Sequence, residues 1–507
     1  MVAKIRTFTF IGLETVDVNV EVKLSSGIVL FNIVGLPDKA VNEAKERIRA
    51  SINSINLSFP AQRLVINLSP ADLNKEGSYL DLPMALGLLV EMGVISQESV
   101  SNYVVLGELS LDGTINSVSG ILPAAIGANK RGLGIICPKS CGSEALLANK
   151  NIEVIAATNL LELIDCIKGV KKAEKPTPKK LVQTESYPDF KDIYGQHLAR
   201  RAAEITAAGG HNLIMVGPPG TGKSMIAERI PGILPDLTPE EVLEVNVINS
   251  VAGKLNDGKF STLRPFLSPH HSCSMPAMVG GGSKPKPGQI TLAHNGVLFL
   301  DELPEFTSQV LDSLRQSIET GKVSIARATQ HITYPANFQL VAAMNPCKCG
   351  YYNNDKKQCK RAPFCAKEYQ NKISGPLLDR FDIFVDVGLI DIFAEKQKLG
   401  DAEGTAEIKK RVCKARNIQL KRYENLKYKL NAKISSSEMN EFIKLDENGE
   451  KLMIYANKKY NFSIRGYNKI IRVARTIADL AGKENINEDH VAESLLFRQT
   501  RYLASLM

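Results

Sequence analysis

The pattern of apolar and polar positions over residues 1–166 alternates between strand-like and helix-like segments. Strands are predicted at 7–12, 16–24 and 63–68. The segment 38–55 follows Gly35-Leu36-Pro37 and repeats its apolar residues at helical spacing, which predicts an amphipathic helix. We therefore predict an independent α/β domain with its own core at 1–166.

Composition changes after this first region. Residues 167–187 are rich in lysine and proline and have no apolar period, so we predict an extended, solvated linker. An ATPase-like α/β core is predicted at 188–391. From 392 to 507 the chain becomes helical and charged, which predicts a helical lid whose basic surface is a solvated face rather than a nucleic-acid site.

A glycine-rich loop at 217–224 lies between an apolar run at 212–216 and the start of a predicted helix. Its residues fit the phosphate-loop pattern at each fixed position: Gly217, Pro218, Pro219, Gly220, Thr221, Gly222, Lys223 and Ser224. Such a loop turns backbone N–H groups toward a polyphosphate, with Lys223 on the β- and γ-phosphates and Ser224 on Mg²⁺. The alternative is a plain turn before a helix. We predict binding of ATP with Mg²⁺.

Two further apolar runs end in polar residues. The run 296–300 ends in Asp301 and Glu302, which predicts a buried strand that delivers Asp301 to Mg²⁺ and Glu302 to the attacking water. The run 338–344 ends in Asn345, which could orient that water or simply begin a turn.

The remaining composition is that of an ordinary globular protein of 507 residues. The net charge of +9 is a modest hint of an anionic partner. The odd count of nine cysteines, without a disulfide framework, favours a reducing compartment. Because the first residues lack the apolar run of a signal peptide and no stretch is long enough to span a bilayer, we expect a cytoplasmic protein without a membrane partner.

A cysteine cluster follows Asn345. Its four thiols, enough for a tetrahedral Zn²⁺ site, belong to Cys347, Cys349, Cys359 and Cys365. Their spacing is not that of paired C-x-x-C knuckles, so free cysteines in a loop remain the alternative.

Together with the segment 375–382, these motifs resemble those of an AAA+ ATPase. The sequence around them is similar to the Mg-chelatase-like YifB/ComM family, and this resemblance covers essentially the whole chain. The segments that carry the family resemblance are 209–213, 269–272, 279–282, 300–306 and 472–480. The resemblance implies an α/β protein with a Lon-protease-like N-terminal domain, an AAA+ P-loop NTPase core with a parallel sheet in three αβα layers, and a helical lid. It also implies that Arg380 acts as an arginine finger and Arg465 as a second sensor, which requires a homo-hexameric ring.

The Lon-like resemblance raises the question of a Ser-Lys protease. The position of the nucleophile corresponds to Tyr79, with Ser78 one residue early, and the activating lysine is missing from 120–124. A serine without an adjacent base is a weak nucleophile, so we expect this domain to be non-catalytic.

Two insertions into the core suggest what the motor acts on. One contains Gly280-Gly281-Gly282 and the other alternates like a β-hairpin over 322–334. In the AAA+ branch that the chain resembles, the corresponding hairpin faces the ring's pore. The candidates for DNA contact in these insertions are Lys284, Lys286, Arg327, Gln330 and His331. A hairpin that only packs on a neighbour is the alternative for each.

The resemblance implies a DNA motor that drives branch migration or unwinding in recombination or natural transformation. Two rival functions remain open. The first is a chelatase-like or chaperone-like ATPase that remodels a protein partner. The second is a protein that is not a motor, either a scaffold or a Lon-like protease.

Overall fold

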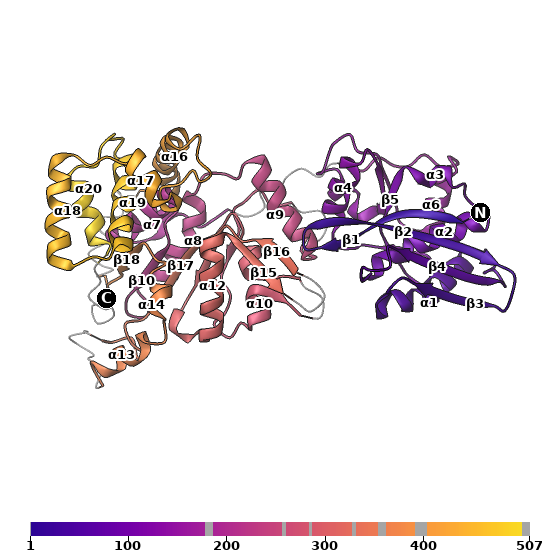
Figure 1. The fold of residues 1–507 in the computed structure, drawn as a ribbon, viewed down its shortest axis with the longest axis horizontal. Helices are drawn as coiled ribbons and strands as arrows, with labels where there is room; N and C mark the ends of the chain where they lie inside the picture. The colour runs from indigo at the N-terminus through magenta and orange to yellow at the C-terminus, as the bar shows by residue number, and fades with distance from the viewer. Residues whose placement is uncertain are drawn as a thin grey trace. The chain divides into compact units, whose positions relative to one another are not determined.

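The computed structural model describes residues 2–177, 186–255, 260–282, 286–326, 331–352, 361–390 and 403–498. The chain divides into two compact units, drawn in Figure 1. The first combines Met1–Val182 with Pro239–Thr262, and the second combines Gln183–Thr238 with Leu263–Met507. The predicted core and lid thus share one unit, while a segment from inside the predicted core belongs to the other.

A seven-stranded sheet forms the first unit, in the order β3-β4-β2-β1-β5-β8-β9. Its strands are β1 (Ala3–Ile11), β2 (Glu14–Ser25), β3 (Leu30–Val34), β4 (Arg63–Ser69), β5 (Tyr103–Val105), β8 (Gly134–Pro138) and β9 (Val154–Ala157). The pairs β1/β2 and β2/β4 are antiparallel and the others parallel. The strands predicted at 7–12, 16–24 and 63–68 are confirmed, although β1 begins earlier, at Ala3.

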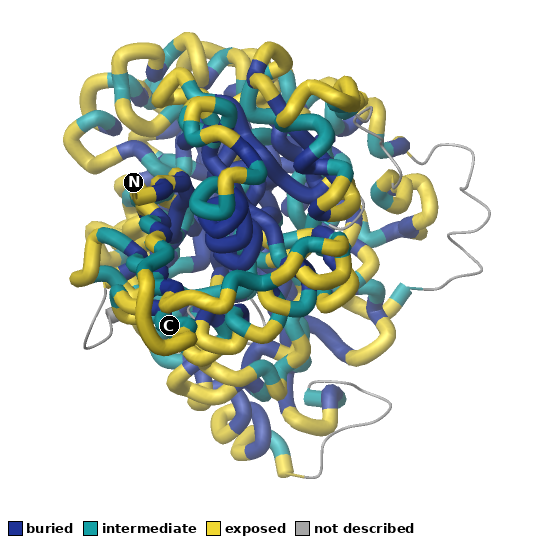
Figure 2. Tube along the Cα trace, turned by 90° about the vertical axis from the view of Figure 1, so that its right-hand side faces the viewer, coloured by how far each residue is buried: buried dark blue, intermediate teal, exposed yellow. Residues whose placement is uncertain are grey.

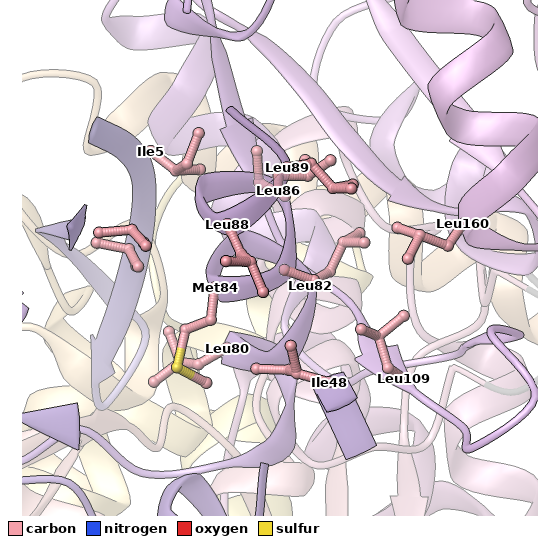
Figure 3. Packing of buried hydrophobic residues seen from close by; sticks show 14 of the residues in the cluster. Ile5, Ile48, Leu80, Leu82, Met84, Leu86, Leu88, Leu89, Leu109 and Leu160 are labelled. Carbon is pink, nitrogen blue, oxygen red and sulfur yellow. The ribbon is translucent and has the colours of Figure 1, made fainter. Parts of the chain in front are cut away.

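Helices cover this sheet, and a short hairpin of β6 (Glu108–Leu109) and β7 (Ile115–Asn116) accompanies it. The helices are α1 (Lys39–Ser54), η1 (Ser78–Leu80), α2 (Asp81–Glu91), α3 (Glu98–Ser101), α4 (Ile121–Lys130), η2 (Lys139–Cys141), α5 (Gly142–Ala145), α6 (Leu160–Ile167) and α9 (Pro239–Val251). The predicted amphipathic helix is α1, and Asp38 caps it by accepting a hydrogen bond from the Val41 N–H at 2.8 Å. Figure 3 shows apolar side chains of β1, α1 and β6 gathered around α2, whose residues 81–89 are all buried and form the centre of this core.

The second unit contains a five-stranded parallel sheet in the order β11-β14-β17-β10-β18. Its strands are β10 (Leu213–Val216), β11 (Phe266–Leu267), β14 (Val297–Leu300), β17 (Gln339–Met344) and β18 (Ile383–Asp386). Successive residues of β10 point to opposite faces: Leu213 and Met215 join one apolar cluster, whereas Ile214 and Val216 join another. The sheet is therefore covered on both faces, which confirms the predicted αβα layering.

Two antiparallel hairpins accompany the sheet. They are β12 (Gly280–Gly281) with β13 (Lys286–Pro287), and β15 (Lys322–Ala326) with β16 (His331–Pro335). The second confirms the hairpin predicted over 322–334.

The helices of the second unit include those of the helical C-terminal region. They are η3 (Phe190–Asp192), α7 (His197–Gly209), α8 (Lys223–Ile233), α10 (Met275–Val279), α11 (Gln289–Leu292), η5 (Leu303–Glu305), α12 (Ser308–Thr320), α13 (Phe364–Gln370), α14 (Gly375–Leu378), α16 (Thr405–Arg422), η7 (Asn431–Lys433), α17 (Ser436–Phe442), α18 (Glu447–Tyr460), α19 (Ile464–Leu480) and α20 (Glu488–Leu496).

Buried segments, dark blue in Figure 2, are enclosed by exposed turns and helix faces. Within the described ranges, no helix has both the length and the apolar character needed to cross a bilayer.

Candidate nucleotide-binding site

The glycine-rich loop connects the end of β10 at Val216 to the start of α8 at Lys223. Gly217 passes so close to β18 that a Cβ atom would lie 2.0 Å from the Val387 carbonyl oxygen. Gly220 and Gly222 have φ angles of 76° and 89°, and open space surrounds the position of a Cβ atom on each. The loop thus has the left-handed turns and the room that a polyphosphate needs beside the N-terminus of α8.

Lys223 lies inside this loop, with its ammonium group aimed at loop carbonyls. It donates to the carbonyl oxygens of Gly217 at 2.9 Å and Pro218 at 2.8 Å, and to Asn345 Oδ1 at 3.3 Å. Burial lowers the pKa of Lys223 to about 8, against the opposing effect of Asp301 and Glu302. A bound phosphate would favour the charged ammonium and replace the carbonyls as its partner.

Ser224 and Asp301 come together although they lie 77 residues apart. The Ser224 hydroxyl donates to Asp301 Oδ2 at 2.8 Å, because parallel strands β10 and β14 end at the same edge of the sheet. A hydroxyl and a carboxylate are the oxygen ligands that Mg²⁺ takes in phosphate sites. The donor set fits Mg²⁺ as predicted from the sequence.

Glu302 follows Asp301 with an unusual backbone conformation, at φ 52° and ψ 49°. Left-handed backbone at a residue other than glycine is a strained conformation that concentrates at functional sites. The Glu302 carboxylate is half-exposed, and the Glu302 N–H donates to Asp301 Oδ1 at 2.9 Å.

His271 is a neighbour of Glu302 that sequence reasoning did not assign to the site. Its Nδ1 lies 3.7 Å from Glu302 Oε2, and its ring packs edge-on against Phe306. His270 stacks on His271 with ring centroids 4.0 Å apart, and its own Nδ1 lies 2.8 Å from the Ser272 hydroxyl. The sequence itself offers only the adjacent histidine pair, which favours hydrogen-bonded loop residues over metal ligands.

The two predicted arginines lie in different surroundings. Arg380 is largely buried and pairs with Glu319 of α12, while its carbonyl accepts from the Asn212 side chain at 2.9 Å. Arg465 is exposed in the first turn of α19. Among the described residues, no hydrogen bond or ion pair joins either arginine to the loop at 217–224. Both roles remain predictions.

The DNA-contact candidates are only partly described. Lys286 lies exposed in β13, and His331 lies exposed at the start of β16. Lys284, Arg327 and Gln330 lie outside the described residues.

The cysteine cluster gives limited support for zinc. Cys347 Sγ and Cys349 Sγ lie 3.2 Å apart, and Cys347 and Cys365 share a small buried cluster. Cys359 lies outside the described residues, and among the residues that are described no group of three metal-ligating side chains is found. The zinc site remains a prediction.

In the first unit, the residues at the position of a Lon-type nucleophile make structural contacts. Ser78 donates to the Glu108 carboxylate, and the Tyr79 hydroxyl lies 3.5 Å from Thr9 Oγ1 with its pKa raised to about 12 by burial. Lys75, fully buried, donates to the Pro70 carbonyl. The Ser78 hydroxyl therefore has a carboxylate partner rather than the lysine that a Ser-Lys protease needs.

Three family descriptions match the chain. Residues 189–393 match magnesium chelatase, subunit ChlI; residues 20–141 match subunit ChlI of Mg-chelatase; and residues 402–498 match the C-terminal part of magnesium chelatase subunit ChlI.

Several proteins are similar over nearly their full length. The protein YifB of Escherichia coli is 41% identical over 97% of this chain and 96% of its own. The competence protein ComM of Haemophilus influenzae is 41% identical over 96% and 95%. The protein Rv2897c of Mycobacterium tuberculosis is 38% identical over 96% and 97%.

Proposed function

Because the chain belongs to the YifB/ComM family of magnesium-chelatase ChlI-like AAA+ ATPases, we propose that it couples ATP hydrolysis to the movement of branched DNA through a homo-hexameric ring. The pairing of Ser224 with Asp301 beneath the glycine-rich loop is the observation that supports the hydrolytic step best.

Each residue of the site has a part in that step. The loop N–H groups and Lys223 hold the phosphates, while Ser224 and Asp301 would hold Mg²⁺, which screens the charge on the transferred phosphoryl group when bound. Glu302 accepts a proton from the attacking water, so that the water oxygen bonds to the γ-phosphorus and ADP leaves. Asn345, within reach of Lys223, orients that water.

The ring follows from the chemistry of the transition state. An arginine supplied from a neighbouring subunit adds positive charge to the γ-phosphate only when copies of the chain assemble. In this proposal Arg380 acts as the arginine finger, and Arg465 acts as the second sensor.

Three observations support DNA as the partner. A relative similar over nearly its whole length is called a competence protein, the hairpin β15/β16 bears exposed His331, and the chain carries a net charge of +9. We place the work of the motor in branch migration or unwinding during recombination or natural transformation, in the cytoplasm, where DNA and ATP are both available.

The rival function is an ATPase that remodels a protein. It is favoured by the name of more distant relatives, such as the magnesium-chelatase 67 kDa subunit of Chlorobaculum parvum, 28% identical over 31% of this chain and 23% of its own.

Steady-state ATP turnover separates the two functions. It is measured without addition, with single-stranded DNA and with a synthetic four-way junction, at two salt concentrations, with Glu302→Gln as the blank. A DNA motor shows turnover that DNA stimulates, that salt weakens and that the variant lacks. Turnover that is indifferent to every DNA overturns the DNA assignment and favours a protein partner.

A further inference from the structure

Helix α16 (Thr405–Arg422) is unusually basic and packs against α7 and α8 of the ATPase core (Figure 1). Lysine or arginine occupies positions 409, 410, 411, 414, 416, 421 and 422, whereas Glu407 is its only acid. Glu407 is already used, because its Oε2 accepts from the Gly404 N–H at 2.9 Å and caps the helix.

Four of the basic residues hold the helix to the protein. Their partners are Asp236 for Lys409, Glu204 and Glu403 for Arg411, the Ala207 carbonyl for Arg416 and Asp479 for Arg422. The acids beside the helix are therefore already neutralised.

The other basic residues, Lys410, Lys414 and Lys421, form a row on the opposite, exposed face together with Asn417. The spacing of four, three and four residues puts them in line along the helix. They line a shallow depression, and in the described part of the chain none of the three lysines makes an ion pair.

This arrangement is unfavourable for the helix alone. Like charges four residues apart, as in Lys410 and Lys414, repel each other and destabilise a helix. A simple solvated face would mix lysine with glutamate, whereas the one acid of this helix, Glu407, lies at the N-terminal end of the row and is engaged in the helix cap. A polyanion would relieve the repulsion and release its own counterions.

We propose that the row Lys410, Lys414, Asn417 and Lys421 binds the phosphate backbone of a DNA duplex. The inference rests on the proposed function, and it departs from the expectation that the basic surface of the lid is only a solvated face. From Lys410 to Lys421 the row extends about 16 Å along a straight helix, long enough to follow several phosphates of one strand. Among the described residues, those that line the depression include no aromatic side chain, whereas sites for single strands stack bases on aromatic rings.

The test uses the full-length protein with a fluorescent duplex and, in parallel, a fluorescent single strand, each followed by anisotropy at several KCl concentrations. The row variant changes the three lysines to glutamine, which keeps helix propensity while removing three charges. A matched control removes the same charge from exposed lysines of the same helical region: Lys444, Lys451 and Lys458.

We expect the row variant to bind the duplex about 10- to 100-fold more weakly near physiological salt, with a salt slope smaller by about 2–3. The control variant should bind like the parent protein, and ATP turnover without DNA should be unchanged in both.

Three results would overturn the inference. If the parent binds the duplex and the row variant keeps its affinity and slope, the row is not the contact and the proposed function stands. If the row variant loses only single-stranded DNA, the commitment to a duplex is wrong. If the parent binds no DNA, the proposed DNA function fails and the inference fails with it.

Discussion

Replacing Arg47 by methionine should destabilise the first unit strongly and more so at higher pH. Arg47 donates to both oxygens of Asp81, at 2.6 and 3.0 Å, and the Asp81 side chain is 0% exposed. Removing one partner of a buried pair leaves an uncompensated charge, at a cost of about 3–5 kcal/mol in the free energy of unfolding.

The pH dependence follows from the carboxyl group that remains. Burial raises the pKa of Asp81 from 3.8 to about 6, although Arg47 opposes the shift. Because the folded state holds the Asp81 proton more tightly than the unfolded chain does, this group contributes stability that is fully present below about pH 4. That stability is lost as the pH rises through about 6. Without Arg47 the pKa rises further, so the loss continues above pH 6 and the penalty of the variant grows with pH.

Urea unfolding followed by circular dichroism measures this penalty, because the chain has no tryptophan to report fluorescence. A matched control is Arg49→Met, whose guanidinium lies 5.1 Å from the Phe59 ring centroid and should cost only about 0.5–1 kcal/mol. In an Arg47→Met, Asp81→Asn double variant the extra pH dependence should vanish. A penalty below about 1 kcal/mol, or one equal at about pH 5 and about pH 7.5, would refute the buried-charge reasoning.

Three further predictions concern the nucleotide site and α9. Glu302→Gln should lower ATP turnover by about 10²- to 10⁴-fold with ATP affinity retained, as measured by phosphate release and nucleotide titration; near-normal turnover would remove Glu302 from the role of base. His271→Ala should lower kcat several-fold with KM little affected, if the imidazole 3.7 Å from Glu302 Oε2 positions that carboxylate. His270→Ala is the matched control, and equal effects of the two variants would argue against positioning. Ser250→Ala should lower the free energy of unfolding by about 1–3 kcal/mol in urea titrations, because buried Glu144 loses a 2.6 Å hydrogen bond; an unchanged midpoint would show that the bond contributes little.

The loop of the candidate phosphate site could be predicted from the sequence because its residues act locally. The loop residues are contiguous, and their spacing fixes which of them face the phosphates. Asp301 could be assigned to the same site because it follows a predicted strand, and the carboxyl ends of parallel strands meet at one edge of a sheet. The 2.8 Å distance between Ser224 Oγ and Asp301 Oδ2 agrees with that assignment.

The place of His271 could not be predicted, because it lies in a loop after β11 that has no apolar period. Only the three-dimensional course of the chain brings it to Glu302. The association of α9 with the first unit could not be predicted from the sequence either. Its apolar residues are not confined to one side, and the Ser250 partner Glu144 lies 106 residues away.

The membership of α9 in the first unit means that the chain passes between the units three times, after Val182, Thr238 and Thr262. A fragment ending at Val182 would lack the helix that packs on α4, and it would expose Glu144 without its Ser250 partner. An N-terminal truncation would in turn leave α9 without its docking face. Separate expression of the two halves should therefore fail as a route to either, unless a 239–262 peptide complements the N-terminal fragment in trans.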